Sequence, residues 1–329
     1  MRLRASILRN MLFFKLAQSV EKIGKSCFLK FTPDYVCFGA IHSVGDNDPA
    51  GGGGAVQCWS RVAKKHLFTD YKSESNCDNE IYLEMKVEDI LLAMRSSSNA
   101  TAVTMRMTGK SVDAYLSFSI TSEDHIGNSR TITQDVPIVR IMSRDGAMTT
   151  TAFDEPMVPP PEVHIMLPPL DRLRHITASY KNIADYIVMS SNLSGEMLLS
   201  TTDGIRSFSH YQQGLDSHAI DARYGIAAKA QIETKFSGLV NPQLTSVEER
   251  YDDGDGEGPH NQRLRERPKD FASVMVKIVD LQRVLQSHCV KPQSVICSVI
   301  PHHSLLFLVY LDSAEEAALT YFIPEPSAQ

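Results

Sequence analysis

Residues 9–24 and 169–184 both predict an amphipathic helix, because apolar side chains recur there every three or four positions, the spacing that places them on one helix face. The apolar positions are Leu12, Leu16, Val20 and Ile23 in the first segment, and Leu173, Ile176, Tyr180 and Ile183 in the second. Each predicted helix therefore packs one oily side on the rest of the protein.

A β-hairpin is predicted after each helix. The first is CFLKFTPDYVCF at 27–38, with Pro33-Asp34 in the turn, and the second is YIVMSSNLSGEMLL at 186–199, with Ser194-Gly195 in the turn. Later, each half has a strand that runs directly into a short helix, followed by two further strands. Both strand-helix junctions read Lys-x-x-Asp, at Lys86 and at Lys277.

This repeated order predicts an α+β protein made of two duplicated domains, each with two helices packed on an antiparallel sheet. Any two α+β halves share some order, so the pattern alone leaves duplication and coincidence both open. The domains are expected at 1–152 and 167–329, joined by a proline-rich connector at 153–166. Two stretches without apolar periodicity are expected to be surface loops: the glycine-rich residues 43–55 and an acidic then basic insertion at about 240–270.

Composition fits a folded protein, with 43% hydrophobic and 22% charged residues among 329. The longest apolar run, SLLFLVYL at 304–311, is far shorter than the roughly 20 residues of a membrane-spanning helix. The opening MRLRASILRNMLFFKLAQ suits a first strand and helix, and an import presequence is the alternative. Six cysteines form no Cys-x-x-Cys pair and mostly lie in apolar runs, which favours free thiols in a reducing compartment.

Motifs of catalysis and metal binding are not found. TGKS at 108–111 lacks the first glycine of a phosphate-binding loop, since that position is Thr104. The adjacent His302 and His303 would point to opposite faces of a strand, and the acidic run at 252–255 lacks the spacing of a calcium loop. We therefore expect no enzyme activity, no cofactor and no metal, with an enzyme whose active site is dispersed along the sequence as the alternative.

Basic residues lie on the predicted helices, although the whole chain has a net charge of −6. They are Lys15, Lys22 and Lys25 in the first helix and its exit, Arg174 and Lys181 in the second, and Arg95 and Arg283 in the two short helices. A single exposed base often serves only solubility, but four helices with the same bias suit a phosphate backbone. No aromatic or base-reading residues accompany them, so double-stranded DNA bound without sequence specificity is predicted.

Several stretches in order along nearly the whole chain resemble the Hus-one-type subunit of the nine-one-one checkpoint clamp. They are MRLRASI at the start, KIGKSC at 22–27, NEIYLEM at 79–85, ITQDVPI at 132–138, EPMVPPPEV at 155–163, LSGEMLL at 193–199 and LTYFIP at 319–324. The resemblance implies the DNA-clamp (processivity-factor) fold, similar to the proliferating-cell sliding clamp, with helices lining a central hole.

The resemblance also implies a non-catalytic subunit of a heterotrimeric ring, completed by Rad-nine-type and Rad-one-type subunits and placed on DNA by a clamp loader. Such a ring supports DNA damage checkpoint signalling and recruits repair enzymes in the nucleus. Ring-lining residues of the family correspond to Lys22, Lys25, Arg95, Lys181 and Arg283, whereas Lys15 and Arg174 are added from helix geometry alone. A homotrimeric sliding clamp for replication is the alternative within this fold.

Ring closure requires strands with open edges at the subunit joints, because their unpaired backbone groups can extend a neighbour's sheet. The candidates are AYLSFSI at 114–120 and SHYQQ at about 209–213.

Overall fold

The computed structural model describes residues 1–41, 56–110, 113–123, 128–142, 158–202, 231–242, 268–311 and 317–326. The first half contains, in order, β1 (Arg2–Ile7), α1 (Asn10–Glu21), β2 (Ser26–Phe31), β3 (Tyr35–Ile41), β4 (Gln57–Ala63), α2 (Lys64–Leu67), β5 (Phe68–Glu74), β6 (Ile81–Lys86), α3 (Val87–Arg95), β7 (Ala102–Lys110), β8 (Asp113–Glu123) and β9 (Ser129–Met142). The second half contains β10 (Val163–Met166), α4 (Leu170–Lys181), β11 (Tyr186–Ser191), β12 (Met197–Thr202), β13 (Gln231–Phe236), β14 (Ala272–Lys277), α8 (Ile278–Leu285), the 3-10 helix η1 (Gln286–Val290), β15 (Ser294–Ile300), β16 (Ser304–Tyr310) and β17 (Ala317–Pro324).

The predicted helices, hairpins and strand-helix junctions are confirmed. All four apolar positions predicted for the first helix are buried, although Ile23 lies just beyond the end of α1. Of the second set, Leu173 and Tyr180 are buried, whereas Ile176 and Ile183 are only half-buried, and Ile183 lies beyond the end of α4. Lys86 and Lys277 each end a strand, and the helix begins at the next residue. The α+β class with antiparallel sheets is therefore correct, and we propose the domain limits stated above for the two halves.

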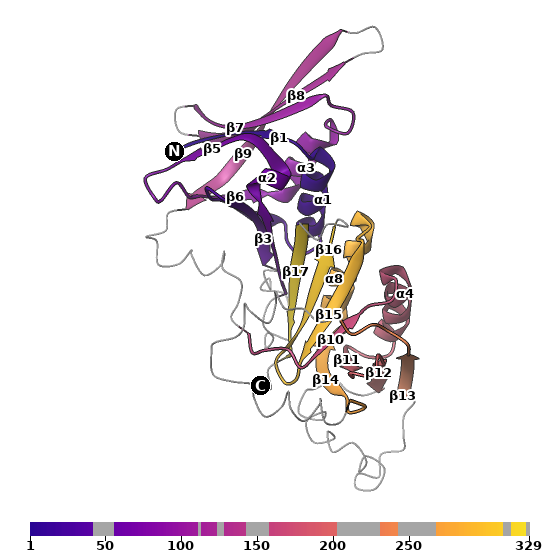
Figure 1. The fold of residues 1–329 in the computed structure, drawn as a ribbon. Coiled ribbons are helices and arrows are strands. Elements are labelled where there is room, and N and C mark those ends of the chain that lie inside the picture. Colours follow the sequence, from indigo (N-terminus) through magenta and orange to yellow (C-terminus); the bar gives the residue numbers. More distant parts are fainter. Residues whose placement is uncertain are drawn as a thin grey trace.

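The two halves share one sheet, a joint that no pattern in the sequence predicts. The last strand, β17, pairs antiparallel with β4 of the first half, from Ala317 opposite Val62 to Phe322 opposite Gln57. The described strands thereby form a 13-stranded sheet in the order β10-β15-β16-β17-β4-β3-β2-β6-β9-β8-β7-β1-β5, and a second sheet in the order β13-β12-β11-β14. Figure 1 shows the shared sheet running from one half into the other.

One predicted edge strand is wrong. Residues 114–120 lie in β8, which is paired on one side with β7 and on the other with β9, so β8 is interior. An open edge lies on β9 instead, because its residues 129–137 pair with β8 alone, while only residues 138–142 pair with β6. The order of the large sheet ends at β5 and β10, which are edge strands as well. In the other sheet, β13 pairs only with β12 among the described strands. The second predicted edge, at 209–213, lies outside the described residues.

A hydrogen-bonded clasp holds the two sheets of the second half together. The Asn241 side-chain amide donates to the backbone carbonyls of His164 (2.8 Å) and Asn192 (3.1 Å), and the Val240 carbonyl accepts from the Met166 amide at 2.8 Å. The segment after β13 therefore bridges β10, in the large sheet, and the turn between β11 and β12, in the small one.

His164 is buried at this junction, with only 9% of its surface exposed, and its Nδ1 lies 2.7 Å from the Ser298 hydroxyl. Burial lowers the pKa of His164 from 6.5 to about 4, because the desolvated ring resists protonation. The unfolded chain then binds a proton more readily than the folded one between these values. Stability contributed by neutral His164 is complete above pH 6.5 and is lost as the pH falls toward 4.

Because of His164, we expect the free energy of unfolding to fall by about 3 kcal/mol as the pH is lowered from 6.5 to 4. His164→Gln keeps a polar partner for Ser298 without titrating, so its loss of stability over this range should be smaller than that of the wild type. Urea unfolding at several pH values measures the difference, with His175→Gln, on the exposed side of α4, as the control. Parallel pH profiles for wild type and His164→Gln would contradict the assignment.

Candidate nucleic-acid interface

The helices of both halves form one layer. α1 packs against α3 and α4 packs against α8, while η1, directly after α8, contacts both α1 and α4. The layer lies on one side of the sheets, as Figure 1 shows for α1, α3, α4 and α8. Each helix buries its apolar side on the sheets, as in Leu16 of α1 and Leu173 of α4, so its polar side faces away from them.

Six of the seven predicted basic residues lie on these helices or cap them, whereas Lys25 lies beyond the end of α1, directly before β2. Lys25, Arg95 and Lys181 are exposed, and the other four, Lys15, Lys22, Arg174 and Arg283, are half-buried. The layer is continuous, so bases from both halves belong to one surface of the molecule. That they bind DNA stays a prediction.

Three of the seven bases form ion pairs with carboxylates, which the spacing of the bases alone does not predict. Lys22 lies 2.8 Å from Glu21, Arg283 lies 2.5 Å from Asp280, and Arg174 lies 3.9 Å from Asp171. Among the described residues, no carboxylate forms an ion pair with Lys15, Lys25, Arg95 or Lys181. These four therefore contribute most of the layer's positive field, because a neighbouring carboxylate cancels much of the charge of the others.

The position of three of these basic residues at helix C-termini has a second physical explanation, which is helix stability. Arg95, Lys181 and Arg283 occupy the last turns of α3, α4 and α8. A cation there interacts favourably with the unpaired carbonyl groups and the helix dipole, typically by 0.3–1 kcal/mol. Replacing them is thus expected to affect helix stability slightly as well as surface charge.

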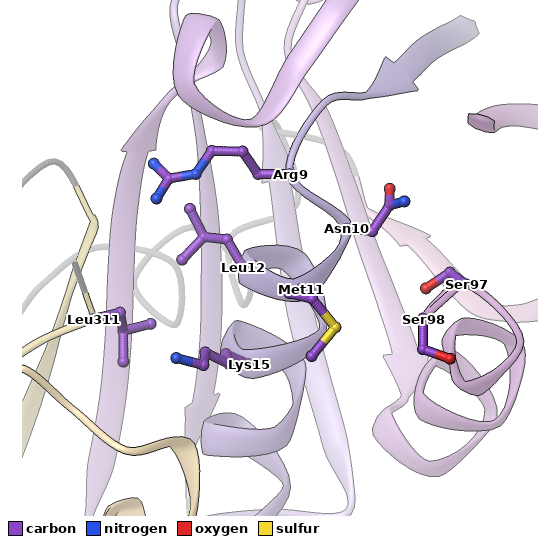
Figure 2. Close-up of a pocket in the computed structure, with 8 residues that line it drawn as sticks. All are labelled: Arg9, Asn10, Met11, Leu12, Lys15, Ser97, Ser98 and Leu311. Carbon is purple, nitrogen blue, oxygen red and sulfur yellow. The ribbon is translucent and has the colours of Figure 1, made fainter. Parts of the chain in front are cut away.

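A cavity of about 390 Å³ opens where α1 begins and α3 ends. It is lined by Arg9, Asn10, Met11, Leu12, Lys15, Ser97, Ser98 and Leu311. In Figure 2 the side chains of Arg9 and Lys15 lie on either side of Leu12 and extend toward Leu311 of the second half. Arg9 thus adds a base to this end of the layer, beside the seven that the sequence predicts.

The layer is not uniformly basic. On α3, Glu88, Leu92 and Arg95 are all exposed, at the helical spacing that aligns them on one side, and Leu92 exposes 60% of its surface. Met11, on α1, exposes 53%. A phosphate backbone would meet scattered bases separated by apolar and acidic side chains, an arrangement suited to weak contacts at several points.

Catalytic and metal-binding chemistry has little support in the residues that the structure describes. These contain no group of three or more His, Cys, Asp or Glu side chains arranged to hold a metal ion. Burial raises the pKa of the Cys27 thiol to about 12 and raises those of Cys58 and Cys297 as well, so these thiols stay protonated. Gly109 is a strand residue of β7, opposite Ala114 of β8, and not a turn residue. None of the described helices combines the length and apolar character that crossing a membrane requires.

Comparison with known proteins gives consistent matches. The family model described as Hus1-like protein matches residues 1–327. Checkpoint protein hus1 of Schizosaccharomyces pombe is 30% identical over 313 residues, which cover 94% of this chain and 93% of that protein. Human checkpoint protein HUS1 is 26% identical over 315 residues, covering 95% and 94%. Among solved structures, PCNA from Thermococcus kodakaraensis matches with a TM-score of 0.62 at 12% identity, covering 98% of this chain and all of that one, which supports the clamp fold.

Proposed function

Because the chain belongs to the Hus1-like family, we propose that it is a non-catalytic subunit of a heterotrimeric ring clamp that encircles duplex DNA at sites of damage. In this role it supports checkpoint signalling and the recruitment of repair enzymes in the nucleus. Its partners are Rad-nine-type and Rad-one-type clamp subunits and a clamp loader.

The observation that carries this proposal is the single helix layer spanning both halves, with Lys25, Arg95 and Lys181 exposed on it and free of carboxylate partners among the described residues. One such layer covers only part of a duplex, so encirclement requires further subunits of similar design. DNA is bound through phosphates alone, without sequence reading.

Retention on DNA then comes from ring closure rather than from affinity. Each base that meets a phosphate adds about 0.9 to the salt exponent of binding, so a few exposed bases bind weakly at physiological salt. A closed ring stays threaded on the duplex despite weak contacts, and weak contacts allow it to slide.

The subunit joints are proposed at the open edges of β9 and β13. Residues 129–137 of β9 and the outer edge of β13 each have backbone groups that are not used by another described strand. Addition of a neighbouring subunit's strand satisfies such groups and continues the sheet across the joint. One edge lies in each half, so one chain can contact two different partners.

The lining role predicts that Arg95→Gln combined with Lys181→Gln weakens DNA binding by the assembled ring. Loss of two phosphate contacts is expected to reduce the slope of log K against log salt by about 1.8, because each contact contributes about 0.9. Duplex binding is measured between 50 and 200 mM salt on the ring co-purified with both partner subunits, and retention is compared on circular and linear DNA.

The matched control is Arg61→Gln combined with Lys269→Gln, which removes two exposed bases that lie on no helix. The control ring should bind DNA like the wild type. An unchanged salt slope for the Arg95 and Lys181 variant would disprove the lining role, and a mass near three times 36.6 kDa for the isolated chain would favour the homotrimeric alternative.

A further inference from the structure

The outward face of β5, β1 and β7 has four exposed basic residues: Arg2, Arg4, Lys72 and Arg106. On β1 the arginines alternate with buried Leu3 and Ala5, whose side chains belong to the core on the helix side. The four bases therefore project from the face opposite the helix layer. In Figure 1 these strands lie together, with α1 and α3 on their other side.

Strand register places three of these bases in one row. Arg4 is directly opposite Lys72 of β5 on one side and Arg106 of β7 on the other. Neighbouring strands are about 4.8 Å apart, so the three Cα positions span roughly 10 Å. Like charges directly opposite across antiparallel strands destabilise a sheet, and here two such pairs share Arg4.

No acid is directly opposite Arg4, Lys72 or Arg106 in the described register, although acids outnumber bases in the chain by 39 to 33. Within the described residues, none of the four bases forms an ion pair. By register, the nearest acids are Glu74, directly opposite Arg2, and Asp135, which follows Ser117 at the end of the row. A third acid, Asp70, lies in the β-bulge between β1 and β5. A cluster of like charges weakens the sheet, and this one has no ion-pair partners among the described residues. Such a cluster is expected where a ligand supplies the opposite charge.

Hydroxyl groups surround the row. Arg106 is opposite Ser117, whose hydroxyl lies 2.8 Å from that of Thr108 and donates to Asp135 at 2.5 Å. The next row across the same strands consists of Ser6, Thr104, Ser119 and Thr133. Ser117 is buried and its proton goes to Asp135, so the accessible donors are the hydroxyls of the next row, where Thr133 is exposed and the other three are half-buried. Such uncharged donors suit phosphate oxygens once arginines have placed the anion.

We propose that this face, the Arg4–Arg106 patch, defined by Arg2, Arg4, Lys72 and Arg106, docks a phosphorylated peptide segment of a partner protein. Guanidinium groups bind phosphate through two parallel hydrogen bonds, and two arginines on adjacent strands can reach one phosphate. A phosphorylated side chain bears nearly two negative charges at neutral pH, which matches the local surplus of cations better than a single carboxylate does.

Duplex DNA fits this patch poorly. A duplex presents phosphates along an extended track, and a protein that binds it often contacts six or more phosphates with basic residues. Here the row of basic residues covers only three strands and is bordered by Glu74 and Asp135. The patch also faces away from the helix layer, so DNA held by that layer does not occupy it. The docking of a phosphopeptide is thus independent of the proposed DNA-binding surface.

Fluorescence anisotropy tests this with the full chain and a labelled peptide, Glu-pSer-Glu-pSer-Glu, against the same peptide without phosphate. We expect the phosphorylated probe to bind at least tenfold more tightly than the unphosphorylated one. Arg4→Gln combined with Arg106→Gln should weaken its binding at least tenfold and leave the melting temperature equal or higher, because repulsion in the row is relieved.

The control variant is again Arg61→Gln combined with Lys269→Gln, which should bind the phosphopeptide within twofold of the wild type. Equal binding by the Arg4 and Arg106 variant and the control would overturn the proposal. It would also be overturned if inorganic phosphate at the same concentration bound as tightly as the peptide, or if a 20-base-pair duplex bound more tightly than the peptide and required Arg4 and Arg106.

Discussion

Replacing Phe13 with alanine is expected to lower the free energy of unfolding by about 3–5 kcal/mol. Phe13, on α1, has no exposed surface, and its ring meets three others in edge-to-face geometry. The centroid distances are 5.1 Å to Phe38 of β3, 6.1 Å to Phe118 of β8 and 6.3 Å to Phe68 of β5. One side chain thus attaches the helix layer to three separate strands, and its removal leaves a cavity that rigid neighbours cannot fill.

Urea unfolding monitored by circular dichroism measures this change. The matched control is Phe14→Ala, the next residue of the same helix, which is only partly buried and should cost clearly less than Phe13→Ala. Both variants gain the same helix propensity, so the difference between them reports packing. If both variants lost the same free energy of unfolding, the ring contacts of Phe13 would not be a main source of stability in the first half.

Gly195→Ala is expected to destabilise the second half by at least about 3 kcal/mol. Gly195 has a φ of +76°, which costs an L-residue roughly 1–2 kcal/mol, and a Cβ there would lie 2.2 Å from the Leu239 carbonyl oxygen. The same residues are joined by a hydrogen bond from the Leu239 amide to the Gly195 carbonyl at 2.9 Å. Backbone must therefore move, since neither contacting group is a flexible side chain.

Gly238→Ala separates the two causes. Gly238 has a similar φ of +72°, but a Cβ added there meets no atom within 4 Å, so only the conformational cost of roughly 1–2 kcal/mol is expected. If the two variants lost similar amounts of stability, the close approach of the Leu239 carbonyl to residue 195 would make no measurable contribution. Because residues 237–242 directly follow β13, Gly195→Ala should also disturb the proposed joint at the β13 edge and reduce recovery of the assembled ring.

The two charged surfaces lie on opposite sides of the protein, and this separation has a functional consequence. The helix layer presents bases of both halves toward one side, whereas the Arg4–Arg106 patch belongs to the first half only and faces the other side. A ring built on the helix layer leaves the patch outside, where a partner protein can reach it while DNA is bound. Variants of one surface should therefore leave the other intact.

Local patterns in the sequence predicted most elements correctly. Apolar spacing located α1 and α4, turn residues located both hairpins, and the repeated Lys-x-x-Asp junctions located α3 and α8. These succeeded because helical and strand periodicities record which side of an element is buried, and burial of one side is the main constraint on such residues. The same patterns indicated which bases stand on helices.

Edge positions and charge pairing needed the tertiary structure. The alternation in residues 114–120 shows the two faces of β8 but not its neighbours, so an interior strand resembled an edge. Residues 129–137 of the next strand, β9, have an open side instead. Similarly, Lys22 and Lys25 look equivalent in sequence, yet only Lys22 has an ion-pair partner in the described residues, Glu21. Side-chain partners depend on distances of a few ångströms that spacing along the chain does not specify.

The sequence by itself determined α1, α3, α4 and α8, most strands, the repeated order of the two halves and the positive character of these four helices, but not the short α2 or η1. Only the tertiary structure decided that β17 joins β4 in one shared sheet, which bases are neutralised, and that Lys72, Arg4 and Arg106 stand side by side. The physical reason is that periodicity is a local property, set by burial within one element, whereas register brings together residues far apart in the chain through backbone hydrogen bonds whose pairing is fixed only when the whole sheet assembles.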